Sequence, residues 1–180
     1  MPADPIPLDL LEVADRDLVV RALDASARAY APYSGFAVGA AIRMRSHDRI
    51  YTGANFENAA YGVTMCAEVS ALAQLHFGGD FNVEAIAVIG HKFIDPVHTS
   101  AIVTPCGRCR QLISEVAQLA NNPYMRILCC SGDLMVLPTT IGELLPEAFG
   151  PRSLGLADVW PGMRHRLDER VRSLHKRPPK

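Results

Sequence analysis

The feature that most constrains the fold is a long apolar run at residues 83–90, VEAIAVIG. It is far shorter than the roughly 18–20 residues that a transmembrane helix needs. A run of this length is typical of a strand covered on both faces, as at the centre of a sheet with helices on either side. The run therefore predicts an α/β domain built around a central sheet.

Periodicity and turn residues place the other elements around this strand. In chain order we expect a helix at 15–30 capped by Asp15, strands at 38–44 and 50–54, a helix at 66–77, a helix at 107–120, strands at 126–130 and 134–139, and a short helix at 141–145. The helix at 66–77 is apolar almost all round and should be buried, whereas the amphipathic one at 107–120 has Leu112 on its inner face. This order implies one five-stranded mixed sheet with helices packed on it.

The five cysteines favour a reducing compartment. Their number is odd and their spacing clustered, which suits a metal or catalytic set better than a disulfide framework. The acidic start MPADPIPLDLLEVAD has no basic segment before an apolar stretch, so no secretory signal peptide is expected. Since no apolar run is long enough to span a membrane, the sequence predicts a cytoplasmic globular protein.

Charge is unevenly distributed along the chain. Residues 1–151 contain 10 Lys and Arg against 16 Asp and Glu, a net −6, while residues 152–180 contain 8 against 3, a net +5. The acidic part disfavours a broad nucleic-acid surface. Residues 158–174 can form a short basic helix, which we interpret as a peripheral or oligomer-packing helix or a frayed end, with a polyanion contact as the alternative.

Two short motifs carry the chemistry. CAE at residues 66–68 opens one expected helix, and PCGRC at residues 105–109 opens the next long one. A Cys-x-x-Cys pair can hold one metal ion, and helix N-termini stabilise thiolates. The thiolates of Cys66, Cys106 and Cys109, with a fourth position open, would make a zinc site of the catalytic kind.

Glu68 has a place in the same site. It follows Cys66 by two residues, and near the tip of its helix it can reach the open metal position as a general base. C-x-E combined with P-C-x-x-C is the known signature of zinc deaminases. Cys129 and Cys130, in contrast, lie inside an expected strand without ligand spacing, and we interpret them as core or surface thiols.

At these residues the chain resembles the cytidine deaminase family, in particular its small tetrameric branch with three cysteine ligands. The resemblance runs from about residue 30 to residue 154, most of the chain. The matching stretches are YSxFxVGAA at 33–41, NFENA at 55–59, Tyr61, CAE at 66–68, PCGxCRQ at 105–111 and ELLPxxFGP at 143–151. The resemblance implies a three-layer sandwich, with a catalytic domain over residues 1–154 and a basic C-terminal extension over residues 155–180.

By the same resemblance, Cys66, Cys106 and Cys109 bind one Zn²⁺ per chain, and Glu68 moves protons. The implied substrate-binding groups are Phe36 at the pyrimidine ring, Asn55 and Glu57 at the ribose 3′-hydroxyl, the Ala67 N–H and Thr104 carbonyl at the amine and O2, and Tyr61 and Phe149 in a neighbouring subunit's site. The implied reaction is hydrolytic deamination of cytidine and 2′-deoxycytidine to the uridine nucleosides plus ammonia. The resemblance also implies a homotetramer with shared active sites. From composition and charge we expect no membrane partner, and a nucleic-acid partner is disfavoured.

One position departs from the family pattern. The tetrameric branch usually has Arg after the Glu of CAE, where it donates hydrogen bonds to ligand sulfurs, and here the residue is Val69. Zn²⁺ with three thiolates has a negative formal charge, which weakens its ability to acidify water. We expect compensation from helix N-termini, backbone N–H groups or Arg110. The same departure, alongside PCGRCRQ, resembles blasticidin-type nucleoside deaminases, so a modified cytosine nucleoside is the alternative substrate.

Two other classes of function compete with this interpretation. A nucleic-acid cytosine deaminase or an RNA-binding module is motivated by the basic tail, but the acidic remainder of the chain opposes it. A structural zinc protein with a degenerate site would need a fourth protein ligand and would have no use for Glu68. The first class predicts a salt-dependent affinity for RNA or DNA, and the second predicts bound zinc without activity.

Overall fold

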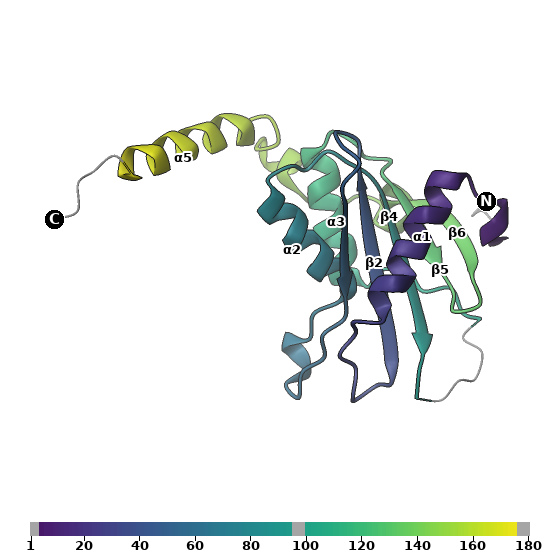
Figure 1. Ribbon diagram of the computed structural model, residues 1–180. Helices are drawn as coiled ribbons and strands as arrows, with labels where there is room; N and C mark the ends of the chain where they lie inside the picture. Colours follow the sequence, from purple (N-terminus) through teal and green to yellow (C-terminus); the bar gives the residue numbers. More distant parts are fainter. Residues whose placement is uncertain (1–3, 95–99, 176–180) are drawn as a thin grey trace. The chain divides into compact units, whose positions relative to one another are not determined.

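The computed structural model describes residues 4–94 and 100–175 (Figure 1). The chain divides into two compact units, of which the first ends at Ala148 and the second begins at Phe149. The first unit contains a single sheet with the helices that pack on it, and the second contains a short 3-10 helix and a longer α-helix. All the predicted metal ligands belong to the first unit.

The sheet has six strands in the order β1-β6-β5-β4-β2-β3. The strands are β1 (Ile6–Pro7), β2 (Phe36–Met44), β3 (Ile50–Ala54), β4 (Val83–Lys92), β5 (Arg126–Cys130) and β6 (Met135–Thr140). β4 pairs in parallel with β5, and the other pairs are antiparallel, so the sheet is mixed as predicted. The expectation of five strands missed β1, because a two-residue edge strand that contains Pro has no alternation by which a sequence could show it.

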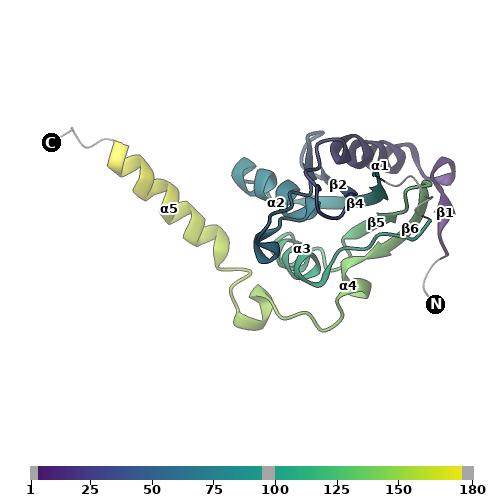
Figure 2. The ribbon, with the colours of Figure 1, turned by 90° about the horizontal axis from the view of Figure 1, so that it is seen from below.

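Helices cover both faces of the sheet, which confirms the three-layer architecture (Figure 2). The helices of the first unit are η1 (Leu8–Leu10), α1 (Val13–Ser26), η2 (Tyr61–Val63), α2 (Ala67–Gly78), α3 (Gly107–Leu119) and α4 (Ile141–Leu144). α1 packs on one face with Ala87 and Ile89 of β4, and α2 and α3 pack on the other with Ile86 and Val88. Because successive side chains of a strand point to opposite faces, β4 is buried on both sides.

The first helix differs from the sequence prediction at both ends. Its N-cap is Glu12, so Asp15 does not cap it, and it ends at Ser26 rather than near residue 30. The Asp15 carboxylate is buried and forms ion pairs with Arg43, at 2.9 Å, and with Arg126. Asp15 therefore joins α1 to β2 and β5, a tertiary role that overrides its preference for a cap.

The two other long helices of this unit are less buried than the sequence predicts. α2 buries Ala71, Leu72 and Leu75, but Phe77 on its outer side is 95% exposed. On α3, Leu112 is 39% exposed instead of facing inward. Apolar composition did not distinguish the face that packs on the sheet from the face that the chain leaves uncovered.

Two glycines set how closely the helices approach the sheet. A Cβ at Gly39 in β2 would lie 1.9 Å from the carbonyl oxygen of Ala22 in α1. A Cβ at Gly53 in β3 would lie 2.4 Å from the carbonyl oxygen of Ala67, the first residue of α2. The absence of a side chain at Gly53 thus lets the start of α2, with the adjacent Cys66, approach the sheet closely.

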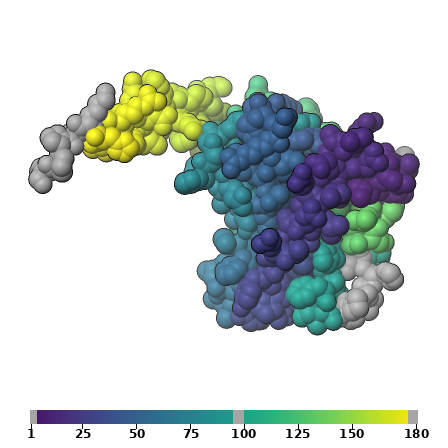
Figure 3. Space-filling model, viewed as in Figure 1, coloured from purple at the N-terminus to yellow at the C-terminus, as the bar shows by residue number. Residues whose placement is uncertain are grey.

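The second unit contains η3 (Pro151–Leu154) and α5 (Trp160–His175), which is drawn in yellow in Figure 3. The basic helix expected at residues 158–174 is therefore present. No residue of α5 is buried in the described chain. Its apolar residues recur at helical spacing and are each 42–56% exposed: Met163, Leu167, Val171 and Leu174.

Candidate metal centre and active site

Three cysteine thiols converge where two helices begin. Cys66 is the N-cap of α2 and Cys106 is the N-cap of α3, while Cys109 is buried in the first turn of α3. The three Sγ atoms lie within 4.8 Å of one another, and those of Cys66 and Cys106 are 3.8 Å apart. Residues 40 positions apart in sequence meet because α2 and α3 pack on the same face of the sheet.

This donor set fits zinc. With Zn–S bonds of about 2.3 Å, a tetrahedral site places its sulfurs about 3.8 Å apart, the separation that Cys66 and Cys106 show. Within residues 4–94 and 100–175, the cluster contains no fourth His, Cys, Asp or Glu. Three protein ligands and one open position are the arrangement of catalytic rather than structural zinc sites.

Cys66 and Cys109 differ in acidity. A hydrogen bond from the Cys109 thiol, with smaller contributions from Cys106 and Arg108, lowers the pKa of Cys66 to about 5. The same hydrogen bond and burial raise the pKa of Cys109. Cys66 therefore loses its proton more readily than Cys109 does, and as a thiolate it can bind a cation.

Glu68 is buried beside the cluster. It lies in the first turn of α2 and is 4% exposed. Burial raises the pKa of its carboxyl, and the negative charge of Cys66 raises it further. A carboxyl with a raised pKa is better matched to accepting and returning protons near neutral pH than a surface glutamate is.

Arg108 provides the positive charge that Val69 does not. Its Nη2 atom donates to the carbonyl oxygen of Thr64 at 2.8 Å and lies 3.8 Å from Sγ of Cys66. The sequence also offered Arg110 as a source of this charge, and that expectation was wrong. The guanidinium of Arg110 donates to Pro105, Thr104 and Leu144 instead of to a sulfur. An arginine within the Cys-x-x-Cys turn thus reaches the thiolate of the other helix.

The predicted ribose-binding residues are held by backbone groups near the start of β2. Asn55 accepts a hydrogen bond from the N–H of Val38 at 2.9 Å and donates to the carbonyl of Phe36 at 3.0 Å. Oε2 of Glu57 accepts from the N–H groups of residues 33 and 34 at 3.0 and 3.2 Å. These bonds fix both side chains, and hydrogen bonds from Ser34 and its neighbour lower the pKa of Glu57.

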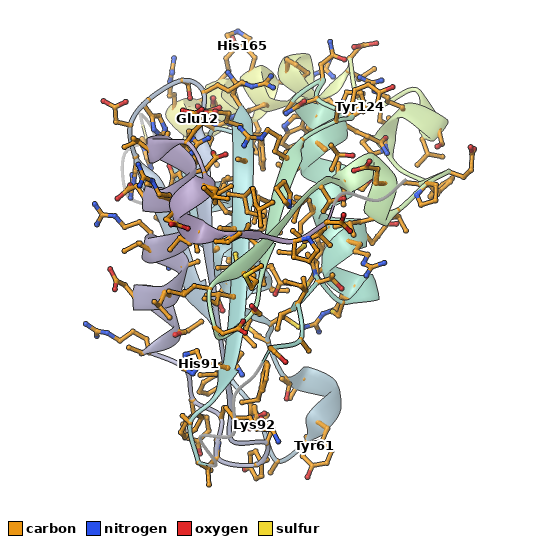
Figure 4. The ribbon with its side chains drawn as sticks, turned by 90° about the vertical axis from the view of Figure 1, so that its right-hand side faces the viewer. Glu12, Tyr61, His91, Lys92, Tyr124 and His165 are labelled. Carbon is orange, nitrogen blue, oxygen red and sulfur yellow. The ribbon has the colours of Figure 1, made fainter. Side chains whose placement is uncertain are left out.

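A cavity of about 190 Å³ lies at this position, lined by Tyr33, Ser34, Glu57, Tyr61 and Thr64. Tyr61 is 75% exposed and its ring meets that of Tyr33 edge-on at 6.0 Å. Tyr61 and Lys92, the last residue of β4, lie at the same end of the sheet, opposite Tyr124 (Figure 4).

The other predicted contact residues are distributed as follows. The ring of Phe36 lies over Gly90, where a Cβ would come within 2.6 Å of it. Ala67 is buried and Thr104 is exposed, with its hydroxyl accepting a hydrogen bond from Arg110. Phe149 is 64% exposed and is the first residue of the second unit.

Sequence reasoning missed the backbone partners of this site. Thr64 accepts the hydrogen bond from Arg108 and lines the cavity, and the N–H groups of Tyr33 and Ser34 bind Glu57. The only signal in the sequence was their proximity to CAE and to YSxF, because a backbone group leaves no side-chain signature.

Cys129 and Cys130 lie outside the cluster. Both are buried in β5, and burial raises the pKa of each thiol to about 12. Neither belongs to a group of converging metal-ligating side chains in the described chain. They are neutral thiols of the core.

Comparisons with known proteins give consistent results. Residues 13–122 match the family model described as the cytidine and deoxycytidylate deaminase zinc-binding region. A cytidine deaminase from Halalkalibacterium halodurans is 40% identical over 136 residues, which cover 75% of this chain and 94% of that protein. A cytidine deaminase from Mycobacterium tuberculosis is 39% identical over 133 residues, covering 72% of this chain and 84% of that one.

Solved structures agree with the sequence relatives. The crystal structure of a cytidine deaminase from Burkholderia pseudomallei superposes with a TM-score of 0.65 at 35% identity, covering 77% of this chain and all of that one. That of the M. tuberculosis enzyme gives 0.60 at 36% identity and covers 77% and 99% of the two chains. Among the described residues, no helix has both the length and the apolar character needed to cross a membrane.

Proposed function

The chain belongs to the family of cytidine and deoxycytidylate deaminases, and from this premise we propose that it hydrolyses cytidine and 2′-deoxycytidine to uridine and 2′-deoxyuridine with release of ammonia. One observation carries the proposal: three thiols converge at two helix starts, and a buried carboxyl lies beside them. The relatives named cytidine deaminase support the substrate class.

Cys66, Cys106 and Cys109 hold the metal. Bound Zn²⁺ supplies Lewis acidity, which makes water a nucleophile at neutral pH. Arg108 lies beside Cys66 and offsets part of the negative charge that three thiolates bring. The N-termini of α2 and α3 contribute in the same direction, because Cys66 and Cys106 are the N-caps of these helices, at the positive end of each helix dipole.

Glu68 transfers the protons. Its carboxylate takes a proton from the attacking water and delivers it to N3 of the pyrimidine while the water oxygen bonds to C4. Glu68 then passes the second proton to the amine, the C4–N bond breaks, and ammonia leaves. The buried position of Glu68 keeps its proton affinity high enough for both directions of transfer.

The remaining residues bind the nucleoside. Asn55 and Glu57, fixed by backbone hydrogen bonds, bind the ribose 3′-hydroxyl, and the ring of Phe36 packs against the pyrimidine. The Ala67 N–H and the Thr104 carbonyl orient O2 and the amine. Residues 1–154 form the catalytic domain, residues 155–180 are an added basic extension, and the thiolate ligands suit a cytoplasmic location.

One substrate panel tests the proposal. Loss of cytosine-type absorbance is followed for cytidine, 2′-deoxycytidine, cytosine, CMP and base-modified cytosine nucleosides, with one zinc per chain verified beforehand. We expect the two plain nucleosides to be the fastest. A clear preference for a modified nucleoside would instead support the alternative motivated by Val69, and no turnover of any nucleoside would contradict the proposal.

Deleting residues 155–180 should leave turnover of free cytidine unchanged, because α5 contributes no buried residue. The measurement is kcat/KM of the shortened and full-length proteins at equal zinc content. If the tail is a nucleic-acid contact, the full-length protein will instead bind RNA or DNA with an affinity that falls steeply with salt. Cytidine turnover that disappears with the tail would place the tail in the catalytic unit.

We also propose a homotetramer whose active sites are completed by a neighbour. Tyr61 and Phe149 are 75% and 64% exposed; Tyr61 precedes Gly62, and Phe149 lies in the segment PEAFGP at residues 146–151. A cavity of about 190 Å³ is small for a nucleoside site, which usually encloses 300 Å³ or more. Exposed aromatic residues of this kind favour interface positions, and at an interface they would enclose the nucleoside in the neighbouring subunit's cavity.

Phe149→Ala should raise KM for cytidine much more than it lowers the melting temperature. Tyr124→Ala is the matched control, because Tyr124 is 76% exposed and lies at the end of the sheet opposite Tyr61 (Figure 4). Sedimentation should show four chains per particle. A monomer that is fully active at the assay concentration would contradict the shared site.

A further inference from the structure

Arg110 makes contacts that the proposed chemistry does not use. Its guanidinium donates to the carbonyl oxygen of Pro105 at 2.8 Å, to the carbonyl oxygen of Leu144 at 3.0 Å and to the hydroxyl of Thr104 at 3.0 Å. In the part of the chain that the structure describes, no carboxylate forms an ion pair with it. The acceptors are all neutral, so these three hydrogen bonds fix the positions of the groups that they join.

These acceptors belong to two separate segments. Thr104 and Pro105 directly precede the predicted ligand Cys106. Leu144 is the last residue of α4, and α4 leads to Phe149 within five residues. The start of α4 is anchored independently by the Thr140 cap, so Arg110 fixes its other end.

Arginine is suited to this position for a physical reason. Its guanidinium presents five N–H donors in a rigid planar fork, which can bind acceptors in divergent directions at once. A lysine ammonium has three donors on a flexible stem and cannot reproduce that fork. The bond to Leu144 also satisfies one of the carbonyls that the end of a helix leaves without a partner.

We infer that Arg110 is a positioning residue: it holds residues 104–106 and the end of α4 in fixed register, so that the metal loop and the segment leading to Phe149 are ordered together. The expected effect on substrate binding rests on the proposed function, whereas the ordering of these two segments does not. Because Glu68 lies on α2, outside both segments, loss of Arg110 should weaken substrate binding more than proton transfer.

The test compares Arg110→Gln with the parent by kinetics and by hydrogen exchange. We expect KM for cytidine to rise about 10- to 100-fold with a smaller fall in kcat, at one zinc per chain. We also expect faster amide exchange in both segments, residues 103–107 and 142–148, with exchange in α1 unchanged. Arg110→Lys should recover part of each effect, because one ammonium can restore one of the three hydrogen bonds.

Arg28→Gln is the matched control, since Arg28 is an exposed arginine of the same unit far from this loop in sequence. Faster exchange in only one of the two segments, or in neither, would overturn the inference even in an active enzyme. A parent protein without cytidine turnover would instead overturn the proposed function, and the exchange experiment would still decide the role of Arg110. Loss of zinc from Arg110→Gln with unchanged exchange in residues 142–148 would show that Arg110 supports the ligand loop alone, and would likewise overturn the inference.

Discussion

Glu68→Gln is expected to bind zinc normally and to lose cytidine turnover by at least about 10²- to 10⁴-fold, the contribution of general acid–base catalysis. The amide has nearly the shape of the carboxyl, so the first turn of α2 and the three thiols should keep their positions. It cannot take a proton from water or deliver one to N3. The measurement is kcat, with zinc content and melting temperature determined on the same samples.

The same substitution should affect stability differently from turnover: we expect turnover to fall and stability not to fall. Burial raises the pKa of Glu68 in the folded chain. The contribution of Glu68 to stability is therefore complete only below the pKa that Glu68 has in the unfolded chain, and it is lost as pH rises through the pKa that Glu68 has in the folded chain. Above the pKa that Glu68 has in the unfolded chain, the parent therefore loses stability that Glu68→Gln, which does not titrate, keeps. The variant should melt at a temperature equal to or above that of the parent.

Glu115→Gln on the exposed side of α3 is the matched control and should change neither turnover nor stability. Retained turnover in Glu68→Gln would remove Glu68 from the mechanism. Lost turnover accompanied by lost zinc would assign the carboxyl to the metal site instead of to proton transfer.

The ligand cluster shows which part of the site a sequence can predict. The spacing of the cysteines and their position at helix starts were sufficient to select Cys66, Cys106 and Cys109. Both signals are local, so they do not depend on knowing how the two helices pack together. The source of the compensating charge was not predictable in the same way. Arg108 and Arg110 are two residues apart on one helix, and only the path of the preceding loop decides which one reaches Cys66.

The fold shows a similar division. The hairpin of β2 and β3 and the central β4 followed from alternation and from the apolar run, which are local signals. The role of Asp15 could not be predicted in this way. An acid at the start of a helix suggests a cap, whereas the two arginine partners of Asp15 lie 28 and 111 residues away in sequence. Long-range pairing of charges is decided by the sheet order, which the local pattern does not contain.

Removing zinc is expected to abolish turnover and also to lower the melting temperature by on the order of 10 °C. Zinc that binds only the folded chain stabilises it by about 4 kcal/mol when its free concentration is 1,000 times the dissociation constant. For a chain of this size, that free energy corresponds to a shift of this order. The sheet, with clusters of buried residues on both faces, should remain folded without the metal. The loss is therefore smaller than the roughly 10–16 kcal/mol seen where zinc alone folds a domain.

Two cysteine variants separate the metal from the core. Cys106→Ser removes an exposed thiol, so it costs little packing, but it should lose zinc, turnover and the metal-dependent part of the melting temperature together. Cys130→Ala removes a buried thiol outside the cluster and should lower stability while keeping one zinc per chain, as measured by elemental analysis.

Adding Zn²⁺ back to the stripped parent should restore both turnover and the melting temperature, whereas Mg²⁺ should restore neither, because it prefers oxygen ligands. A stripped protein with an unchanged melting temperature would contradict the coupling, and zinc lost from Cys130→Ala but kept by Cys106→Ser would overturn the ligand assignment.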